Sequence, residues 1–314
     1  MKKVIANILI IIGNILPENI RHMFKNIMLK TFRYLPEGTK GTVSFCKNKY
    51  ELRNLNKSYF SFQLFCEGAE SSEPETVLHL EELMSEYNFF LDIGANIGQY
   101  AMYITSVSPN AKVHCFEPNE KVFDFLKQNI EKNNLEKNIH LHQIALGDEK
   151  GTAELNIPES LMSSSLRSGW RSAKHTSIVE VNTLDDFCKE HDIKESSLIK
   201  IDVEGFEEQV LNGGKEYLTN HRPDLIIEIL NEFDDNLEKF LADLGYKFYH
   251  ITPFGFKEKD RIIKGQNTGE KYLYMNYFFS TKEKHHFSQL YQHNSHKIKR
   301  LPLDKIYKLT ADCD

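Results

Sequence analysis

Apolar and polar positions follow two regular patterns along the chain from residue 73 onward. Five short apolar runs are each typical of a buried β-strand, and they lie at 89–94, 112–117, 139–146, 197–202 and 224–230. Stretches with the spacing of an amphipathic helix separate them. Because each connecting helix must bury its apolar stripe against the sheet, we expect mostly parallel strands with helices on both faces. The predicted fold class is a doubly wound α/β sheet.

Weaker patterns complete the expected order of elements. Helices are predicted at 75–87, 99–107, 207–211 and 234–244, and further strands at 42–46, 59–65, 153–157 and 246–251. An alternating run at 272–279 suits a last strand. The acidic, serine-rich stretch at 67–75 indicates a boundary near residue 72. The expected division is an accessory region at 1–72, a main domain at 73–280 and a polar tail at 281–314.

The first 16 residues combine two lysines with an apolar run. The run is shorter than the roughly 20 apolar residues of a spanning helix, and no small-residue cleavage site follows it. Asn7 and Asn14 are seven residues apart and share one helical face, so an amphipathic helix is predicted. Two roles stay open for residues 1–35: docking on the protein itself or in a homodimer, and peripheral contact with the inner face of a membrane.

Composition and charge exclude several classes of protein. The chain has 314 residues and 40% of them are hydrophobic, which is enough for a sizeable buried core. A net charge of −6 disfavours a general nucleic-acid binder. Five cysteines at no CxxC spacing favour a reduced, cytoplasmic protein without a zinc knuckle. His285, His286, His293 and His296 are interpreted as part of a solvated tail.

The clearest chemical signal lies where the first of the five strands ends. Residues 92–98 read DIGANIG, and the two glycines allow a tight turn into the next helix. A dinucleotide fingerprint needs a third glycine, but the pattern here is Gly94-x-Asn96-x-Gly98, and Asp92 would repel a phosphate. The turn therefore disfavours a Rossmann-type oxidoreductase and fits a cationic or zwitterionic ligand.

A second carboxylate, Glu117, ends the next strand 25 residues after Asp92. This position suits a group that accepts hydrogen bonds from both hydroxyls of an unphosphorylated ribose. Asp92 could take an ammonium group, and Ala145 with its apolar neighbours could line an adenine edge. These are the parts of S-adenosylmethionine. The turn residues expected to hold its amino-acid chain are Gly94, Ala95, Asn96 and Gly98.

The chain resembles the FkbM-type class I S-adenosylmethionine-dependent methyltransferases in five segments. In chain order they read DIGANIGQYA, CFEPN, ALGDEKGTAEL, SLIKIDVEGFEEQVLNGG and RPDLIIEI. The resemblance spans roughly residues 73–280, so the N-terminal helical extension lies outside it. It implies a seven-stranded, mostly parallel sheet whose antiparallel seventh strand the run at 272–279 can supply. It also implies methyl transfer, most often to a hydroxyl of a sugar, glycan or natural product.

Methyl transfer to a hydroxyl needs a group that accepts its proton, and we expect this group at the end of the fourth strand. Asp202 and Glu204 are two residues apart, so a continuing strand would direct both towards the donor pocket. We interpret Glu204 as the base and Asp202 as a cofactor-binding or orienting group, with Glu228 in support. Two rival roles stay open: a helix N-cap before Phe206, and an Mg²⁺ site, which is not favoured, formed by Asp202, Glu204 and Glu228.

The long serine-rich segment at 158–177 is expected to cover the acceptor. Its serines can bind hydroxyls, and Leu161, Leu166 and Trp170 can exclude water; the rival interpretation is a disordered surface insertion. The expected partner is a small-molecule or glycan acceptor, because the element with which nucleic-acid methyltransferases grip a flipped base is missing. A methyltransferase of a nitrogen or carboxylate and a non-catalytic adenosylmethionine-binding scaffold stay open as alternatives.

Overall fold

The computed structural model describes most of the chain. The described residues are 2–46, 48–69, 73–158, 164–167, 175–194, 197–229, 235–252, 255–260 and 276–283. The histidine-rich part of the tail, Trp170 and residues 272–275 of the last predicted strand lie outside these ranges.

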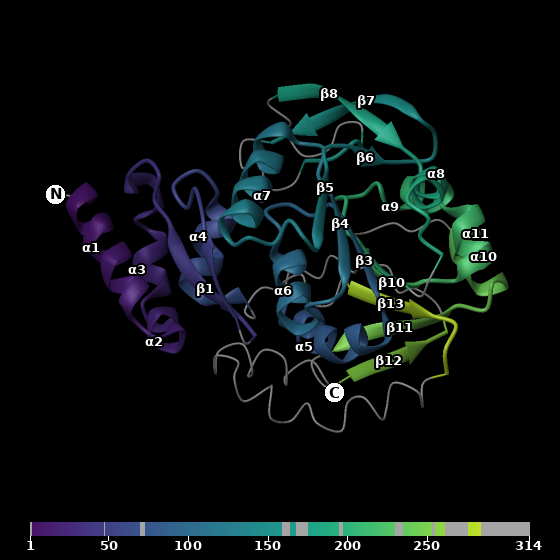
Figure 1. The fold of residues 1–314 in the computed structure, drawn as a ribbon, viewed down its shortest axis with the longest axis horizontal. Helices are drawn as coiled ribbons and strands as arrows, with labels where there is room; N and C mark the ends of the chain where they lie inside the picture. The colour runs from purple at the N-terminus through teal and green to yellow at the C-terminus, as the bar shows by residue number, and fades with distance from the viewer. Residues whose placement is uncertain are drawn as a thin grey trace.

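An eight-stranded sheet forms the centre of the molecule (Figure 1). Its order is β12 (Gly255–Lys259), β11 (Lys247–Thr252), β13 (Asn276–Ser280), β10 (Asp224–Glu228), β9 (Ser197–Ile201), β3 (Phe89–Ile93), β4 (Lys112–Phe116) and β5 (Ile139–His142). The last five are parallel to one another, and β13 is antiparallel to both of its neighbours. The predicted doubly wound α/β fold with an antiparallel seventh strand is confirmed, and β12 adds an eighth strand.

Helices cover both faces of this sheet, because successive residues of a buried strand point to opposite sides. Phe90 packs with the helices α5 (Pro74–Leu83), α6 (Gln99–Val107) and α7 (Glu120–Lys132). Leu91, the next residue, packs with α8 (Leu184–Glu190), α9 (Glu207–Asn212), α10 (Lys215–His221) and α11 (Asp235–Asp243). The two apolar cores account for the continuous hydrophobic runs seen in the sequence.

A smaller sheet lies beside the carboxyl ends of these strands. It contains β6 (Ala145–Leu146), β8 (His175–Asn182) and β7 (Gly151–Ile157), in that order. The predicted single strand at 139–146 is wrong, because β5 ends at His142 and the next two residues join neither sheet. The chain thereby leaves the main sheet and brings β6 to the strand ends.

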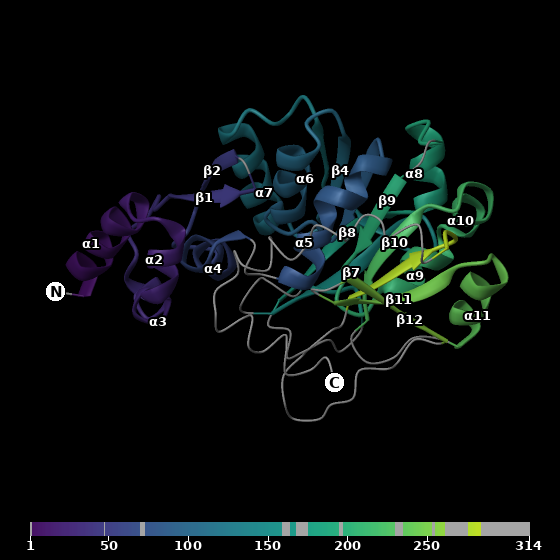
Figure 2. The same cartoon turned by 90° about the horizontal axis from the view of Figure 1, so that it is seen from below.

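The N-terminal region packs against α6 and α7. It contains α1 (Lys2–Ile15), α2 (Glu18–Met23), α3 (Lys25–Leu29), the short helix η1 (Phe32–Tyr34), the hairpin β1 (Gly41–Phe45) with β2 (Asn48–Leu52), and α4 (Tyr59–Glu67). The backbone N–H of Arg53 in the segment after β2 donates to Oδ1 of Asn129 on α7 at 2.9 Å. Another short helix, η3 (Met84–Glu86), follows α5. The first helices lie at one end of the molecule in both views (Figures 1 and 2).

The strand predicted at 59–65 is a helix. The hydroxyl of Ser58 accepts a hydrogen bond from Ser61 N at 3.1 Å and caps α4. Phe62, Phe65 and Cys66 are buried at three- and four-residue spacing, so the aromatic-rich run follows the helical period. The amphipathic helix predicted near the N-terminus is α1, and no helix within the described ranges is long and apolar enough to cross a membrane.

Candidate active site

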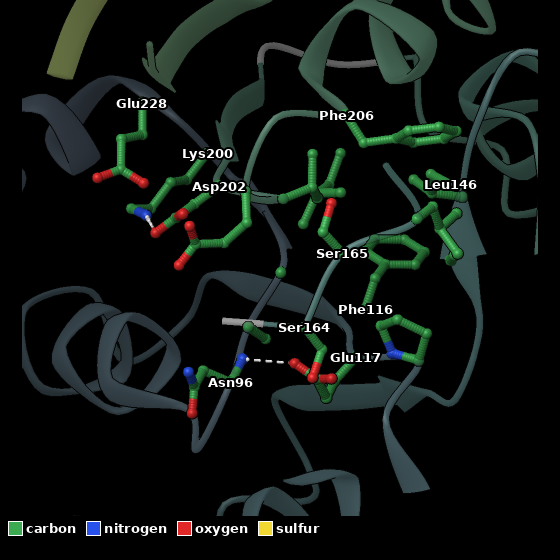
Figure 3. A pocket seen from close by; sticks show the side chains of 18 of the residues that line it. Asn96, Phe116, Glu117, Leu146, Ser164, Ser165, Lys200, Asp202, Phe206 and Glu228 are labelled. Atoms are coloured by element: carbon green, nitrogen blue, oxygen red, sulfur yellow. Dashed lines mark hydrogen bonds and ion pairs between the residues drawn. The ribbon is translucent and has the colours of Figure 1, made fainter. Parts of the chain in front are cut away.

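A cavity of about 220 Å³ opens where β3, β4 and β9 end, which is the expected place for a ligand in a doubly wound sheet (Figure 3). Eight of the residues predicted to bind the cofactor or to act in catalysis line it: Gly94, Ala95, Asn96, Glu117, Ala145, Asp202, Glu204 and Glu228. Two other predicted residues, Asp92 and Gly98, are not among its lining residues.

Other parts of the protein pack closely against the two glycines of the first turn. Gly94 has a φ of 87°, and a Cβ on it would lie 1.9 Å from the carbonyl oxygen of Asp202. Gly98 also has a φ of 87°, and a Cβ there would lie 2.6 Å from the side chain of Leu126 on α7. The glycines are therefore needed for close packing against the chain after β9 and against α7, and Gly94 also lines the cavity.

Glu117 is fixed at the wall of the cavity. Its side chain is buried, and Oε2 accepts from the N–H of Asn96 at 3.1 Å (Figure 3). Oε1 accepts from the N–H of Asn119 at 2.9 Å. Burial raises the pKa of Glu117 to about 7, although the two N–H groups lower it in part. The turn after β3 thus orients the carboxylate that ends β4.

A buried ammonium group sits between carboxylates on the other side of the cavity. Lys200 is 1% exposed, and its Nζ lies 2.6 Å from Oδ2 of Asp202 and 4.5 Å from the ring centre of Tyr100. Burial disfavours the charge on Lys200, but Asp202, Glu73 and Asp92 outweigh that effect and raise its pKa. The ammonium group is therefore a permanent positive charge beneath the cavity.

Asp202 and Glu228 form a coupled carboxyl pair. Their side chains share a hydrogen bond, and burial together with the negative charge of Asp202 raises the pKa of Glu228 well above its usual range. Despite its own burial, Asp202 has a lowered pKa, because Lys200 and the hydrogen bond from Glu228 favour its charged form. Glu228 consequently holds the proton and donates a hydrogen bond to the charged Asp202.

Asp92 belongs to this charge cluster and lies behind the cavity wall. It stands opposite Lys200 in the pairing of β3 with β9 and is 2% exposed. Its Oδ2 has no hydrogen-bond partner among the described residues. Burial raises the pKa of Asp92 to about 7, and Lys200 opposes the shift. The role predicted for Asp92, direct contact with an ammonium group, is not supported by a position in the lining.

Glu204 reaches the cavity by a different route from the predicted one. The strand was expected to continue beyond residue 202, but β9 ends at Ile201 and Glu204 has a φ of 55°, in the left-handed region. Asp202 and Glu204 nevertheless both line the cavity. The rival role of Glu204 as a helix N-cap is wrong, because α9 begins after Phe206 with no side-chain cap and Glu207 accepts the N–H of Gly205 at 2.9 Å.

The lining residues that the sequence reasoning missed include Lys200, Tyr100 and Glu73. Oε2 of Glu73 accepts from the hydroxyl of Tyr100 at 2.6 Å and from Nδ2 of Asn276 at 3.0 Å. A signal existed for Lys200, since it is the single charged residue within the apolar strand SLIKI. Glu73 gave none, because its acidic surroundings are typical of a linker.

Part of the segment expected to cover the acceptor lies at the cavity. Ser164, Ser165 and Leu166 are lining residues, and the Oγ of Ser164 accepts from Nδ2 of Asn119 at 2.9 Å. Trp170, the predicted stacking residue, lies outside the described ranges.

The carboxylates of the site are poorly suited to bind a metal ion. Asp202, a ligand of the rival Mg²⁺ site, already binds the ammonium group of Lys200. Within the described ranges, no group of three or more His, Cys, Asp or Glu side chains is arranged to hold a metal ion. The carboxylates of this site are thus balanced by a lysine.

A comparison with models of protein families identifies one family. The model of the methyltransferase FkbM domain matches residues 92–248. Methyltransferase 1 of Beauveria bassiana is 28% identical in an alignment 172 residues long that covers 49% of this chain and 67% of that protein. The 2-O-methyltransferase NoeI of Sinorhizobium fredii is 31% identical in an alignment 147 residues long that covers 42% of this chain and 59% of that protein.

A solved structure titled methyltransferase FkbM, from Methylobacillus flagellatus, aligns with a TM-score of 0.40 and 18% identity. The alignment covers 62% of this chain and 44% of that one. This chain therefore spans less than two thirds of that protein and of NoeI.

Proposed function

The chain belongs to the FkbM methyltransferase family, and we propose that it transfers the methyl group of S-adenosylmethionine to a hydroxyl of a sugar, glycan or natural product. The hydroxyl is favoured by the relative named 2-O-methyltransferase. The observation that carries the proposal is the position of Glu117 at the cavity wall, oriented by two backbone N–H groups.

The lining residues fit the cofactor. Glu117 presents two carboxylate oxygens that can accept from neighbouring ribose hydroxyls. Phe116, Ala145 and Leu146 form an apolar wall beside it that suits an adenine ring (Figure 3). Asn96, next to Glu117, is at the side of the cavity where the amino-acid part would lie. We assign Asp92 an indirect role, in which it stabilises the charge of Lys200 beneath the site.

In this reaction the protein must mainly align the acceptor hydroxyl with the methyl group and provide a group that accepts the hydroxyl proton. S-adenosylmethionine supplies a methyl group on a sulfonium sulfur, which is a good leaving group. Asp202 is a poor base because Lys200 and Glu228 stabilise its charged form, and Glu228 already holds a proton. We therefore assign proton removal from the acceptor hydroxyl to Glu204, which lines the same cavity.

Two variants test the assignment. Glu117→Gln should weaken S-adenosylmethionine binding about 5- to 150-fold in calorimetry, because a hydroxyl loses a charged acceptor. Glu120→Gln, a change at an exposed residue on α7, is the matched control. Affinity of Glu117→Gln equal to that of the control would refute the cofactor site.

Glu204→Gln should lose turnover and keep cofactor affinity. Methyl transfer from labelled S-adenosylmethionine to a panel of sugars and glycans measures the turnover, with and without a chelator. A chelator effect reversed by Mg²⁺ would replace the base by a metal site. Full activity of the variant would remove Glu204 from the mechanism.

We also propose that the reaction takes place in the cytoplasm. The proposal is supported by Cys66, Cys115 and Cys188, which are free thiols as expected in a reducing compartment.

A further inference from the structure

The three N-terminal helices expose many large apolar side chains. On α1 the exposed residues are Val4, Ile5, Ile8, Ile11, Ile12 and Ile15, and on α2 and α3 with the residue between them they are Ile20, Met23, Phe24 and Ile27. Their side chains are between 36% and 78% exposed. Among the other residues that the structure describes, the large apolar ones with comparable exposure are Tyr59 and Ile178. We call these ten residues the N-terminal apolar surface.

The opposite face of α1 is fixed to the protein, so this surface is a rigid part of the fold. Gly13 is so close to Phe65 that an added Cβ would lie 2.8 Å from its ring. Oδ1 of Asn14 accepts the N–H of Thr42 at 3.0 Å. The buried Arg21 donates to the carbonyl groups of Gly13 and Thr42 at 3.1 and 3.0 Å. Since one face of α1 is fully engaged, the other face needs a partner outside the described fold.

The charge of this region differs in sign from that of the rest of the chain. Residues 2–36 hold six basic residues and one acidic residue, a net charge of +5. The whole chain carries −6, so the remainder carries −11. The single acid, Glu18, is paired with Arg21 at 3.2 Å. Lys3, Lys30 and Arg33 are exposed, and none of them has an ion-pair partner among the described residues.

We propose that the N-terminal apolar surface docks this protein on an anionic phospholipid bilayer, with the aliphatic side chains in the interface and the basic residues on lipid phosphates. Helix α1 is about 21 Å long at 1.5 Å per residue, so it lies along the membrane and does not cross it. A homodimer fits less well, because a symmetric contact would bring two regions of charge +5 together. The negative remainder of the chain favours an orientation in which only this end meets the membrane.

Vesicle sedimentation with the full chain tests the proposal. The protein should sediment with vesicles of phosphatidylcholine and phosphatidylglycerol, and much less with phosphatidylcholine alone. Ile8→Gln combined with Ile11→Gln should abolish binding, whereas Ile178→Gln, at a residue 69% exposed on β8, should not. Replacing Lys30 or Arg33 with glutamine should lower the partition coefficient about fivefold each, because a basic residue near such a surface contributes roughly that factor.

Three results would overturn the proposal: no binding to anionic vesicles by the wild type, equal binding by wild type and the double isoleucine variant, or a stable dimer in light scattering that the double variant converts to a monomer. Circular dichroism confirms that each variant is folded. S-adenosylmethionine affinity, measured on the same samples, should be equal in all of them, so failure of membrane binding is distinguishable from failure of the proposed reaction.

Discussion

Replacing Lys200 with methionine should destabilise the protein strongly, because it removes the one positive charge from a buried cluster of carboxylates. Nζ of Lys200 lies 2.6 Å from Asp202, and the side chain of Lys200 is almost completely buried. Loss of one partner of such a pair leaves an uncompensated buried charge, which costs about 3–5 kcal/mol. Methionine keeps most of the length of the side chain, so the loss of packing is small. The free energy of unfolding in urea, followed by circular dichroism at pH 8, measures the loss.

The loss should become smaller as the pH falls. The ion pair lowers the pKa of Asp202 in the folded wild type, so its stabilisation is present at every pH above the unfolded value of about 3.9. In Lys200→Met the ammonium group no longer opposes burial, so the pKa of Asp202 rises and protonation relieves the buried charge at lower pH. We therefore expect a smaller difference between wild type and variant at pH 5.5 than at pH 8.

Two further variants complete this experiment. Lys200→Met combined with Asp202→Asn should recover much of the stability, because neither charge is then left alone. Lys150→Met is the matched control: Lys150 also contacts two carboxylates, Asp186 at 3.1 Å and Glu190 at 2.9 Å, but at the exposed surface. The reasoning is refuted if Lys200→Met is no more destabilised than Lys150→Met, or if its loss is independent of pH.

Three other substitutions test the turn, the ribose site and the histidines. Gly94→Ala should lower the free energy of unfolding in urea more than Gly245→Ala does. Both glycines have a φ of 87°, but only at Gly94 would the added Cβ meet a backbone oxygen. Equal losses of stability would show that φ alone matters. S-adenosylmethionine affinity should decrease below pH 7 as Glu117, whose pKa is about 7, takes up a proton, and calorimetry of Glu117→Gln should give a flatter pH profile; parallel profiles would contradict this. Burial and three neighbouring histidines lower the pKa of His114 to about 3, so the unfolded state binds a proton first and stability falls as the pH drops below about 6.5. His114→Phe should remove about 2 kcal/mol of the acid-induced loss between pH 7.5 and pH 5, and an unchanged loss would contradict the shift.

The parts of the site that could be predicted are local in sequence. Gly94, Asn96 and Glu117 follow directly from a strand, a turn and the next strand, and the pattern of each is complete within a few residues. The fold class was predictable for the same reason, because periodicity identifies buried strands and helices one at a time. The helix at 59–67 was predicted as a strand, because a short aromatic-rich run fits both the helical and the strand period. Only the positions that are buried in the structure distinguish the two.

The charge cluster could not be predicted, because it depends on contacts between distant segments. Lys200 lies over the ring of Tyr100 from α6, and Glu73, from a segment that looks like a linker, stabilises its charge. Glu228, on the neighbouring strand, also feels the charge of Lys200. The position of Asp92 behind the wall likewise follows from its pairing with Lys200 across two strands. Nothing in the spacing of these residues reveals that pairing.

The position of β13 in the sheet has a consequence for the order of events during synthesis. β13 is the last described strand in the chain, yet it lies between β10 and β11. Until it leaves the ribosome, β10 presents an open edge, and β11 with β12 forms a hairpin without a place in the main sheet. The parallel half of the sheet can assemble earlier, because all of its strands precede residue 229. A nascent chain thus exposes an unpaired, aggregation-prone strand edge on β10 until β13 pairs with it. A chaperone would be needed most during the synthesis of the residues between β10 and β13.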